Sequence, residues 1–326
     1  MIRHILAGAA LTLALGQTAD AQDKVTFGTN WRAQAEHGGY YQAVAAGIFK
    51  SHGLDVEIRQ GGPSVNHSQL LAAGRIDFNM GGNLFDTWNY VKQGVPMVTI
   101  AAIFQKDPSV IITHPSQGHD SLAALKGKPI LVSPGARETY WQWLKAVFGY
   151  SDDQIRPYTF NMAPFIADKR MSQQGFATAE PYAIEKQSGI KPVVFLLADH
   201  GYATYSTTIE TSWKLAREKP DLVQRFVDAT IKGWHSYIHG DPAPGNALIK
   251  KDNPDMTDDQ IAASIKSMKD YGIVDSGDSK TLGIGAMNEQ RIAAFFDFAV
   301  KAGLYPANLD YKSGHTLQFV NKKVGM

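Results

Sequence analysis

Residues 54–80, LDVEIRQGGPSVNHSQLLAAGRIDFNM, hold the pattern that decides the fold. Apolar and charged residues alternate over residues 54–59, which predicts a half-buried strand. Glycine and proline turn the chain at residues 61–63, and a helical apolar pattern follows over residues 65–73. A short run at residues 76–80 predicts the next strand. Strand, helix and strand joined by short turns predict parallel pairing with a right-handed crossover.

The same alternation extends in both directions from this stretch. Strand signals at residues 25–27 and 97–104 bound a first unit of strands and helices. The order restarts with a strand at residues 110–112 and continues to a strand at residues 193–197. The last third is mostly helical, with one apolar helix face expected over residues 220–238. The fold class is therefore α/β, with two parallel-sheet units that form two lobes.

Composition excludes several classes of function. The chain has 32 Lys+Arg against 31 Asp+Glu and no basic stripe, so neither nucleic acid nor an anionic membrane surface is an expected partner. It has no cysteine, which excludes disulfides, thiol nucleophiles and Cys-ligated metal sites. The patterns HExxH and GxSxG do not occur. We expect no cofactor, no metal and no catalytic residue.

The first residues predict a secretory signal peptide over residues 1–21. Arg3 and His4 form a short, potentially positive start, and residues 5–15 are apolar without a charge. The sequence Ala-Asp-Ala at residues 19–21 fits a small-x-small cleavage site. The apolar run is shorter than the roughly 20 residues that span a bilayer. Because no cysteine is available for a lipid anchor, we expect the mature chain to diffuse freely in a periplasm.

Ligands of open parallel sheets bind beyond the carboxyl ends of the strands, so the loops at those ends form the candidate site. These loops carry aromatic, imidazole, amide and carboxylate side chains, and paired glycines that let backbone N–H groups approach a ligand. Such a set suits a flat, polar heterocycle. The loop residues that we expect to bind ligand are Trp31, His37, Gly62, Asn83, Ser133, Asn161 and Glu180.

Several of these residues also have a purely structural interpretation. Trp31 fits a core aromatic, and His37 fits a cap at a helix start. Glu180 stands directly before a proline, where a helix N-terminus stabilises negative charge. Asn66 and His67 fit the surface of the helix in the opening stretch.

Four segments carry a resemblance to a known family. Residues 30–41, NWRAQAEHGGYY, and residues 47–56, GIFKSHGLDV, resemble the start of the NMT1/THI5-like substrate-binding proteins of ABC importers. Residues 70–78, LLAAGRIDF, and residues 175–182, GFATAEPY, resemble two further segments of that family. The resemblance covers nearly the whole mature chain, and its early block and Glu-Pro turn are its more specific parts.

The resemblance implies a type 2 periplasmic binding protein fold with two α/β lobes and a two-segment hinge. One lobe would comprise residues 23–107 plus 203–326, and the other residues 108–202. The crossing segments would lie near residues 105–109 and 201–206. Ligand would favour the closed state, which then docks on an inner-membrane ABC permease driven by a separate ATPase. The chain itself has no P-loop, and a monomer is expected.

The resemblance also suggests a ligand and its contacts. Pyrimidine-precursor binders, which belong to thiamine-precursor uptake, stack the ring on aromatics and use a carboxylate for its amino groups. Carried over, Trp31 and Tyr40 would stack the ligand and Glu180 would accept its hydrogen bonds. Tyr40 also fits simple helix packing.

Three alternatives stay open at this point. A sulfonate, taurine or nitrate binder would need anion donors, which the turn at residues 133–137 could supply. A THI5-like pyrimidine synthase would be an enzyme, but it needs a cysteine-rich motif that this chain lacks. A sensor or chemoreceptor subunit would have the same sequence features as a transport protein.

Overall fold

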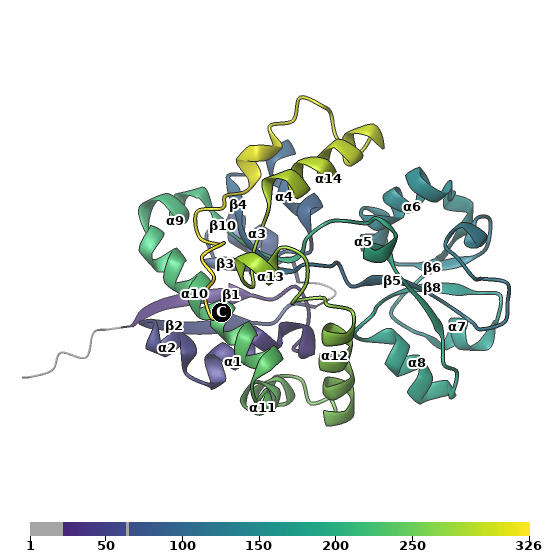
Figure 1. Cartoon of the computed structure of the whole chain (residues 1–326), viewed down its shortest axis with the longest axis horizontal. Coiled ribbons are helices and arrows are strands. Elements are labelled where there is room, and N and C mark those ends of the chain that lie inside the picture. Colours follow the sequence, from purple (N-terminus) through teal and green to yellow (C-terminus); the bar gives the residue numbers. More distant parts are fainter. Residues whose placement is uncertain (1–21, 63–64) are drawn as a thin grey trace, which may run out of the picture.

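The computed structural model describes residues 22–62 and 65–326 (Figure 1). The predicted signal peptide at residues 1–21 lies outside these residues. Within the described part, no helix is both long enough and apolar enough to cross a membrane. The structure is built on two five-stranded sheets, each with helices packed beside it.

The first sheet has the strand order β2-β1-β3-β10-β4. β1 lies between β2 and β3 and pairs in parallel with both, while β10 runs antiparallel to β3 and β4. The sheet is therefore mixed, and the expectation of a purely parallel sheet is wrong. The reason is that the chain enters β10 directly from the second sheet, without the crossover helix that parallel pairing would need. The strands are β1 (Asp23–Gly28), β2 (Leu54–Arg59), β3 (Phe78–Met80), β4 (Met97–Phe104) and β10 (Ser206–Ser212).

The second sheet has the strand order β7-β6-β8-β5-β9. β6 pairs in parallel with β7 and β8, and β5 runs antiparallel to β8 and β9. Figure 1 shows this sheet with its helices as a teal body beside the rest of the chain. The strands are β5 (Ser109–Thr113), β6 (Ile130–Val132), β7 (Ile155–Pro157), β8 (Ser172–Phe176) and β9 (Val193–Leu196). The helices are α5 (Pro134–Arg137), α6 (Tyr140–Phe148), α7 (Ala163–Ala167) and α8 (Glu180–Ser188).

The remaining helices belong mostly to the first sheet and the C-terminal third. They are α1 (Gly38–Ala45), α2 (Ile48–Ser51), α3 (His67–Ala72), α4 (Leu84–Lys92), α9 (Trp213–Glu218), α10 (Pro220–His239), α11 (Ala243–Asp252), α12 (Asp258–Asp270), α13 (Ser279–Leu282) and α14 (Glu289–Lys301). Short 3-10 turns are η1 (Ala35–His37), η2 (Ala123–Leu125), η3 (Asp152–Gln154), η4 (Leu197–His200) and η5 (Tyr311–Gly314).

The predicted apolar face of α10 is confirmed, and it packs into the hydrophobic core beside the first sheet. Phe226 and Trp234 on this face are completely buried. The ring of Phe226 stacks on Phe78 of β3, with centroids 3.9 Å apart. Burial of large aromatic side chains of this kind contributes most of the stability of such a core. This contact holds α10 against the first sheet.

Three expected elements of the second unit are displaced. Strands expected at residues 158–160 and 176–178 lie at β7 and β8, which end earlier. The helix expected over residues 162–171 is confined to α7. β8 has the sequence SQQGF, and its first four residues are buried although three of them are polar. Because its pattern is not apolar, periodicity did not reveal where this strand begins.

Two segments connect the sheets, and one arginine holds both of them. The Arg291 Nη2 donates to the carbonyl oxygens of Gln105 at 2.5 Å and Thr204 at 3.1 Å, and its Nε donates to that of Ala203 at 2.9 Å. The guanidinium also lies 4.0 Å from the ring of Tyr205. Arg291 therefore ties the outgoing and returning chain together. These segments coincide with the predicted hinge, and the lobe boundaries at residues 107–108 and 202–203 remain a prediction.

Arg291→Ala is expected to lower the free energy of unfolding by roughly 2 kcal/mol or more, because three carbonyl groups lose charge-assisted hydrogen bonds. Chemical denaturation measures the loss. Arg170→Ala is the matched control, since the Arg170 side chain is 84% exposed and pairs with the neighbouring Asp168. Equal stability of the two variants would show that Arg291 does not hold the crossing segments.

Candidate functional site

A cavity of about 360 Å³, here called the cleft, lies between loops of the two sheets. From the first sheet it is lined by the segment after β1 and the segment after β3. From the second it is lined by the segments after β6, β7 and β8. The residues that line the cleft and are used below are Trp31, Glu36, His37, Asn83, Asp86, Asp107, Ser133, Tyr140, Phe160 and Glu180. The cleft thus lies where the carboxyl ends of the strands predicted it.

Five of the eight predicted ligand-binding residues line the cleft. They are Trp31, His37, Asn83, Ser133 and Glu180. Three others do not line it: Tyr40, Gly62 and Asn161. The structure brings the five together from four separate loops, and their contact with a ligand remains a prediction.

The three remaining residues have other surroundings. Tyr40 is completely buried, with its ring 4.5 Å from Phe27 and edge-on to Trp234, because α1 packs against α10. Asn161 is exposed, and its Oδ1 accepts a hydrogen bond from the Ala163 N–H at 3.0 Å at the start of α7. A side chain at Gly62 would meet no atom within 4 Å. Packing accounts for Tyr40, and helix capping accounts for Asn161.

Two aromatic rings face each other from opposite sheets. Trp31 follows β1 and Phe160 follows β7, and their ring centroids are 5.1 Å apart. Phe160 is 53% exposed and has a φ of +61°, a left-handed conformation that costs a bulky residue about 1–2 kcal/mol. Exposure of a large ring on a strained backbone points to a role other than stability. The pair provides an apolar wall for the cleft.

Acidic side chains dominate the charge of the cleft. Glu36, Asp86, Asp107 and Glu180 line it, and none of its described lining residues is Lys or Arg. Burial raises the pKa of Glu36 to about 7 and also raises the pKa of each of the others. The cleft is therefore neutral or negative near pH 7, and its described lining offers an anionic ligand no Lys or Arg partner.

The hydrogen bonds that Glu180 already accepts show which of its carboxylate oxygens could still accept one from a ligand. Its Oε2 accepts from the Phe176 N–H at 2.8 Å, and the Tyr158 hydroxyl donates to its Oε1 at 3.4 Å. A carboxylate oxygen accepts two hydrogen bonds, so each oxygen retains capacity for a ligand N–H. Glu180 also stands at the first turn of α8, as its structural interpretation anticipated. The position at the helix start is confirmed, and contact of Glu180 with a ligand remains a prediction.

His37 presents a neutral imidazole. It is 1% exposed, and burial lowers its pKa to about 3. Its Nδ1 has no hydrogen-bond partner among the residues that the structure describes. A buried polar atom without a partner is costly, and a ligand that reached it would remove the cost. The ring is not a helix cap, since no side-chain bond from it to α1 is formed.

The two sides of the cleft touch through the turn that precedes α8. The Thr178 hydroxyl donates to Glu36, which belongs to η1. Two serines of α12 donate to the same turn, Ser264 to the Thr178 carbonyl at 2.6 Å and Ser267 to the Ala177 carbonyl at 2.7 Å. Figure 1 shows α12 beside α8. The loops that line the cleft are thereby held close to one another.

Some of the paired glycines serve the chain's own contacts. A Cβ at Gly39 would lie 2.2 Å from the Trp234 ring, so this glycine serves the packing of α1 on α10. The Gly81 N–H donates to the Thr208 carbonyl at 2.9 Å, and the Gly82 N–H donates to Asp86 at 2.8 Å. These glycines admit the chain's own groups, which their sequence pattern alone does not distinguish from a ligand.

Sequence reasoning missed several lining residues. Glu36 and Asp107 lie in segments expected to be loops or hinge, and Phe160 was assigned to a strand. Tyr140 lines the cleft while Trp141 donates to Asp152 at 2.9 Å, consistent with their adjacent positions at a helix start. Within the described residues, no group of three or more His, Asp or Glu could hold a metal ion.

A family model described as NMT1/THI5 like matches residues 34–243. The chain belongs to this family. The segments quoted above from residues 47–56, 70–78 and 175–182 fall within the match. Membership confirms the family resemblance that those segments carried.

Known proteins similar to this chain are named for different functions. RibY of Chloroflexus aurantiacus, named a riboflavin-binding protein, is 23% identical over 221 residues, or 64% of this chain and 61% of RibY. The 4-amino-5-hydroxymethyl-2-methylpyrimidine phosphate synthase of Aspergillus parasiticus is 26% identical over 109 residues, or 33% of this chain and 32% of the synthase. The chain therefore matches less than two thirds of the length of either relative.

A solved structure confirms the fold. The periplasmic aliphatic sulphonate binding protein SsuA of Escherichia coli superposes with a TM-score of 0.67 at 13% identity, covering 89% of this chain and 91% of SsuA. Together with the two mixed sheets, this likeness establishes the periplasmic binding protein fold. At this identity it carries no information on the ligand.

Glu36→Gln is expected to flatten the pH dependence of stability. Burial raises the folded-state pKa of Glu36 from 4.5 to about 7, so the folded protein holds more protons than the unfolded chain between these values. The free energy of unfolding of the natural protein therefore falls as pH rises through this window. Glutamine cannot ionise, so the variant should be more stable at pH 8 by roughly 1–3 kcal/mol, and the difference should shrink toward pH 4.

Urea denaturation at each pH measures this difference. Glu57→Gln is the control, because the Glu57 side chain is 64% exposed and pairs only with Arg59 on the surface. A constant difference between Glu36→Gln and the natural protein from pH 4 to pH 8 would contradict the assigned ionisation.

Proposed function

We propose that the chain is the solute-binding component of an ABC importer, and that it closes on a neutral or cationic, flat heteroaromatic molecule of the pyrimidine or thiamine-precursor kind. Family membership and the periplasmic binding protein fold support the class of protein. The single observation that carries the ligand class is the cleft, with two facing aromatic rings, four carboxyl groups and no Lys or Arg among its described lining residues.

The proposed binding mode follows from this lining. Trp31 and Phe160, whose ring centroids lie 5.1 Å apart, would together contact one face or the edge of the ligand ring, where an aromatic wall favours a planar ligand. Glu180 would accept hydrogen bonds from ring amino groups. His37, as a neutral imidazole, would exchange one further hydrogen bond with the ring. A positive charge on the ligand would stabilise the ionised carboxylates.

The names of the relatives agree with a heteroaromatic ligand. RibY is named for riboflavin, and the synthase for a pyrimidine phosphate. A sulfonate would have to bind at Ser133 and the start of α5, which has only four residues, with Glu180 in the same cleft. Arg137, the basic residue of that turn, does not line the cleft. Electrostatic repulsion therefore disfavours the anion alternative.

A binding role is also favoured over catalysis. A pyrimidine synthase of this family would need the cysteine motif, and the chain has no cysteine. The proposed partners are a small-molecule ligand and an inner-membrane permease with a separate ATPase. The proposed location is the periplasm, reached by means of the predicted signal peptide, with the protein acting as a monomer. The lobes of residues 23–107 plus 203–326 and 108–202 would move about the two crossing segments.

Binding should respond to the aromatic wall and to Glu180. We expect 4-amino-5-hydroxymethyl-2-methylpyrimidine, thiamine or riboflavin to raise the melting temperature, whereas taurine and nitrate should not. Trp31→Ala and Glu180→Gln should each weaken binding about tenfold or more, through lost stacking and a lost charge-assisted hydrogen bond. Thermal-shift screening followed by isothermal titration measures both effects.

Glu138→Gln is the control, because Glu138 is exposed between α5 and α6 and does not line the cleft. Taurine or nitrate binding more tightly than every heteroaromatic would overturn the ligand class and leave the fold unaffected. Turnover of a bound pyrimidine would overturn the assignment as a binding protein.

A further inference from the structure

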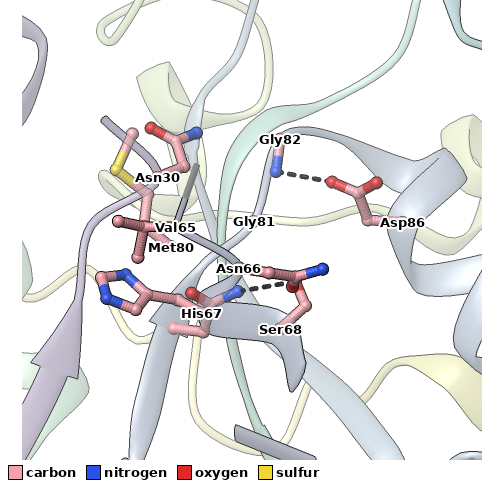
Figure 2. A pocket seen from close by; sticks show the side chains of 10 residues that line it. Asn30, Val65, Asn66, His67, Ser68, Met80, Gly81, Gly82 and Asp86 are labelled. Carbon is pink, nitrogen blue, oxygen red and sulfur yellow. Dashed lines mark hydrogen bonds between the residues drawn. The ribbon is translucent and has the colours of Figure 1, made fainter. Parts of the chain in front are cut away.

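A second cavity, of about 450 Å³, adjoins the cleft and is here called the annexe (Figure 2). Its lining residues are Asn30, Val65, Asn66, His67, Ser68, Asn79, Met80, Gly81, Gly82 and Asp86. Four of these, namely Asn30, Met80, Gly82 and Asp86, also line the cleft. Figure 2 shows Asn30 and Met80 on one side, Asn66 and Ser68 on another, and Asp86 facing Gly82. A molecule in the cleft can therefore extend into the annexe.

The lining of the annexe differs in kind from that of the cleft. It has three amides, a hydroxyl, an imidazole and a carboxyl group, and none of its described lining residues is Phe, Tyr, Trp, Lys or Arg. The imidazole of His67 is held by a hydrogen bond between its Nδ1 and the Thr29 carbonyl at 2.8 Å. Amides and hydroxyls both donate and accept hydrogen bonds, so the lining offers both kinds of group.

Asn79 supplies an independent sign that the annexe receives a ligand. It is 2% exposed, and its Nδ2 donates to Glu210 at 2.9 Å and to the Ser68 hydroxyl at 3.4 Å. Its Oδ1 has no hydrogen-bond partner among the described residues. Such an acceptor costs about 1–3 kcal/mol unless a donor reaches it. A donor in the annexe would satisfy it.

The acids around the annexe limit the charge of what it can hold. Glu210 lies behind Asn79 and is completely buried, and burial raises its pKa to about 8. Burial raises the pKa of Asp86 as well. Gly81 allows this arrangement, since a Cβ there would lie 2.1 Å from Glu210 Oε1. Near neutral pH the protonated form of Glu210 dominates, so this acid adds little charge to the annexe and attracts neither an anion nor a cation strongly.

We propose that the annexe binds a hydroxylated chain or sugar carried by the heteroaromatic ring, so that the ligand has a flat head and a polyol tail. Each hydroxyl donates one hydrogen bond and accepts others, which matches the mixed lining. An ammonium group would leave the amide N–H groups unpaired, and an alkyl chain would leave the polar lining groups unpaired. The inference rests on the proposed function, because the cleft must hold the ring.

Matched pairs of compounds test the tail separately from the ring. The pairs are uracil and uridine, adenine and adenosine, and lumiflavin and riboflavin, which differ by the hydroxylated substituent. For the pair whose ring fits, the hydroxylated member should bind the natural protein at least tenfold more tightly by isothermal titration. The measured quantity is the ratio of the two dissociation constants within a pair, which is insensitive to a general loss of folded protein.

Ser68→Leu fills the annexe and should reduce this ratio to about one. Gln69→Leu is the matched control on the same helix, because Gln69 is exposed and does not line the annexe. It should keep the ratio of the natural protein. Circular dichroism and thermal unfolding verify that both variants fold.

The outcomes separate the two proposals. Loss of the ratio in Ser68→Leu and its retention in Gln69→Leu support the annexe. Equal binding of both members of a pair, or an unchanged ratio in Ser68→Leu, overturns the annexe and leaves the heteroaromatic cleft standing. If neither member of any pair binds, the annexe proposal fails, and the proposed function fails with it only if the hydroxymethylpyrimidine and thiamine do not bind either.

Discussion

The close packing of α1 on α10 is the constraint on which the site depends. A Cβ at Gly38 would lie 2.0 Å from the Tyr237 ring, and a Cβ at Gly233 would lie 2.3 Å from the Gly39 carbonyl oxygen. Only glycine permits such an approach without a shift of the helices. Because η1 leads directly into α1, this packing also fixes Glu36 and His37 at the edge of the cleft. The interaction that builds the core therefore positions the binding loop.

The second organising feature is the burial of acids beside the strand ends. Desolvation raises the pKa of Glu36 and Glu210 to about 7 and about 8, which sacrifices stability at neutral and higher pH. Nothing in the packing of the two cores requires these acids, since uncharged residues of similar size would fill the same space at less cost. Their presence is understandable as the chemistry of recognition. Of the two, only Glu36 lines the cleft, and a ligand that donated a hydrogen bond to it would recover part of the lost free energy.

The sequence determined those elements whose patterns are periodic or well delimited. The strand at β2 and the final helix α14 follow from alternation and from a helix stop at Gly303, whose φ is +74°. The start of β8 could not be predicted, because most of its buried residues are polar. The antiparallel pairing of β5 and β10 could not be predicted either, because it depends on contacts distant in sequence. Within the site, loop position identified Trp31 and Glu180. The same reasoning could not show that Tyr40 is a core residue and not a ligand contact, because its burial against α10 depends on packing distant in sequence. It also could not identify Phe160, because a left-handed backbone at phenylalanine has no sequence signature.

On the proposed function, closure and recognition would be coupled, because neither sheet alone carries all the residues that line the cleft. Trp31 and His37 belong to one side of the cleft, whereas Phe160 and Glu180 belong to the other. A ligand ring beside the Trp31–Phe160 pair would be contacted by groups from both sides only when the turn before α8 approaches η1, which is the approach that the Thr178 hydrogen bond to Glu36 already makes. A ligand can shift an equilibrium only by its difference in affinity for the two states. The division of aromatic and acidic groups between the two sides would provide that difference, and the hydrogen bonds of Arg291 would hold the crossing segments together during the movement.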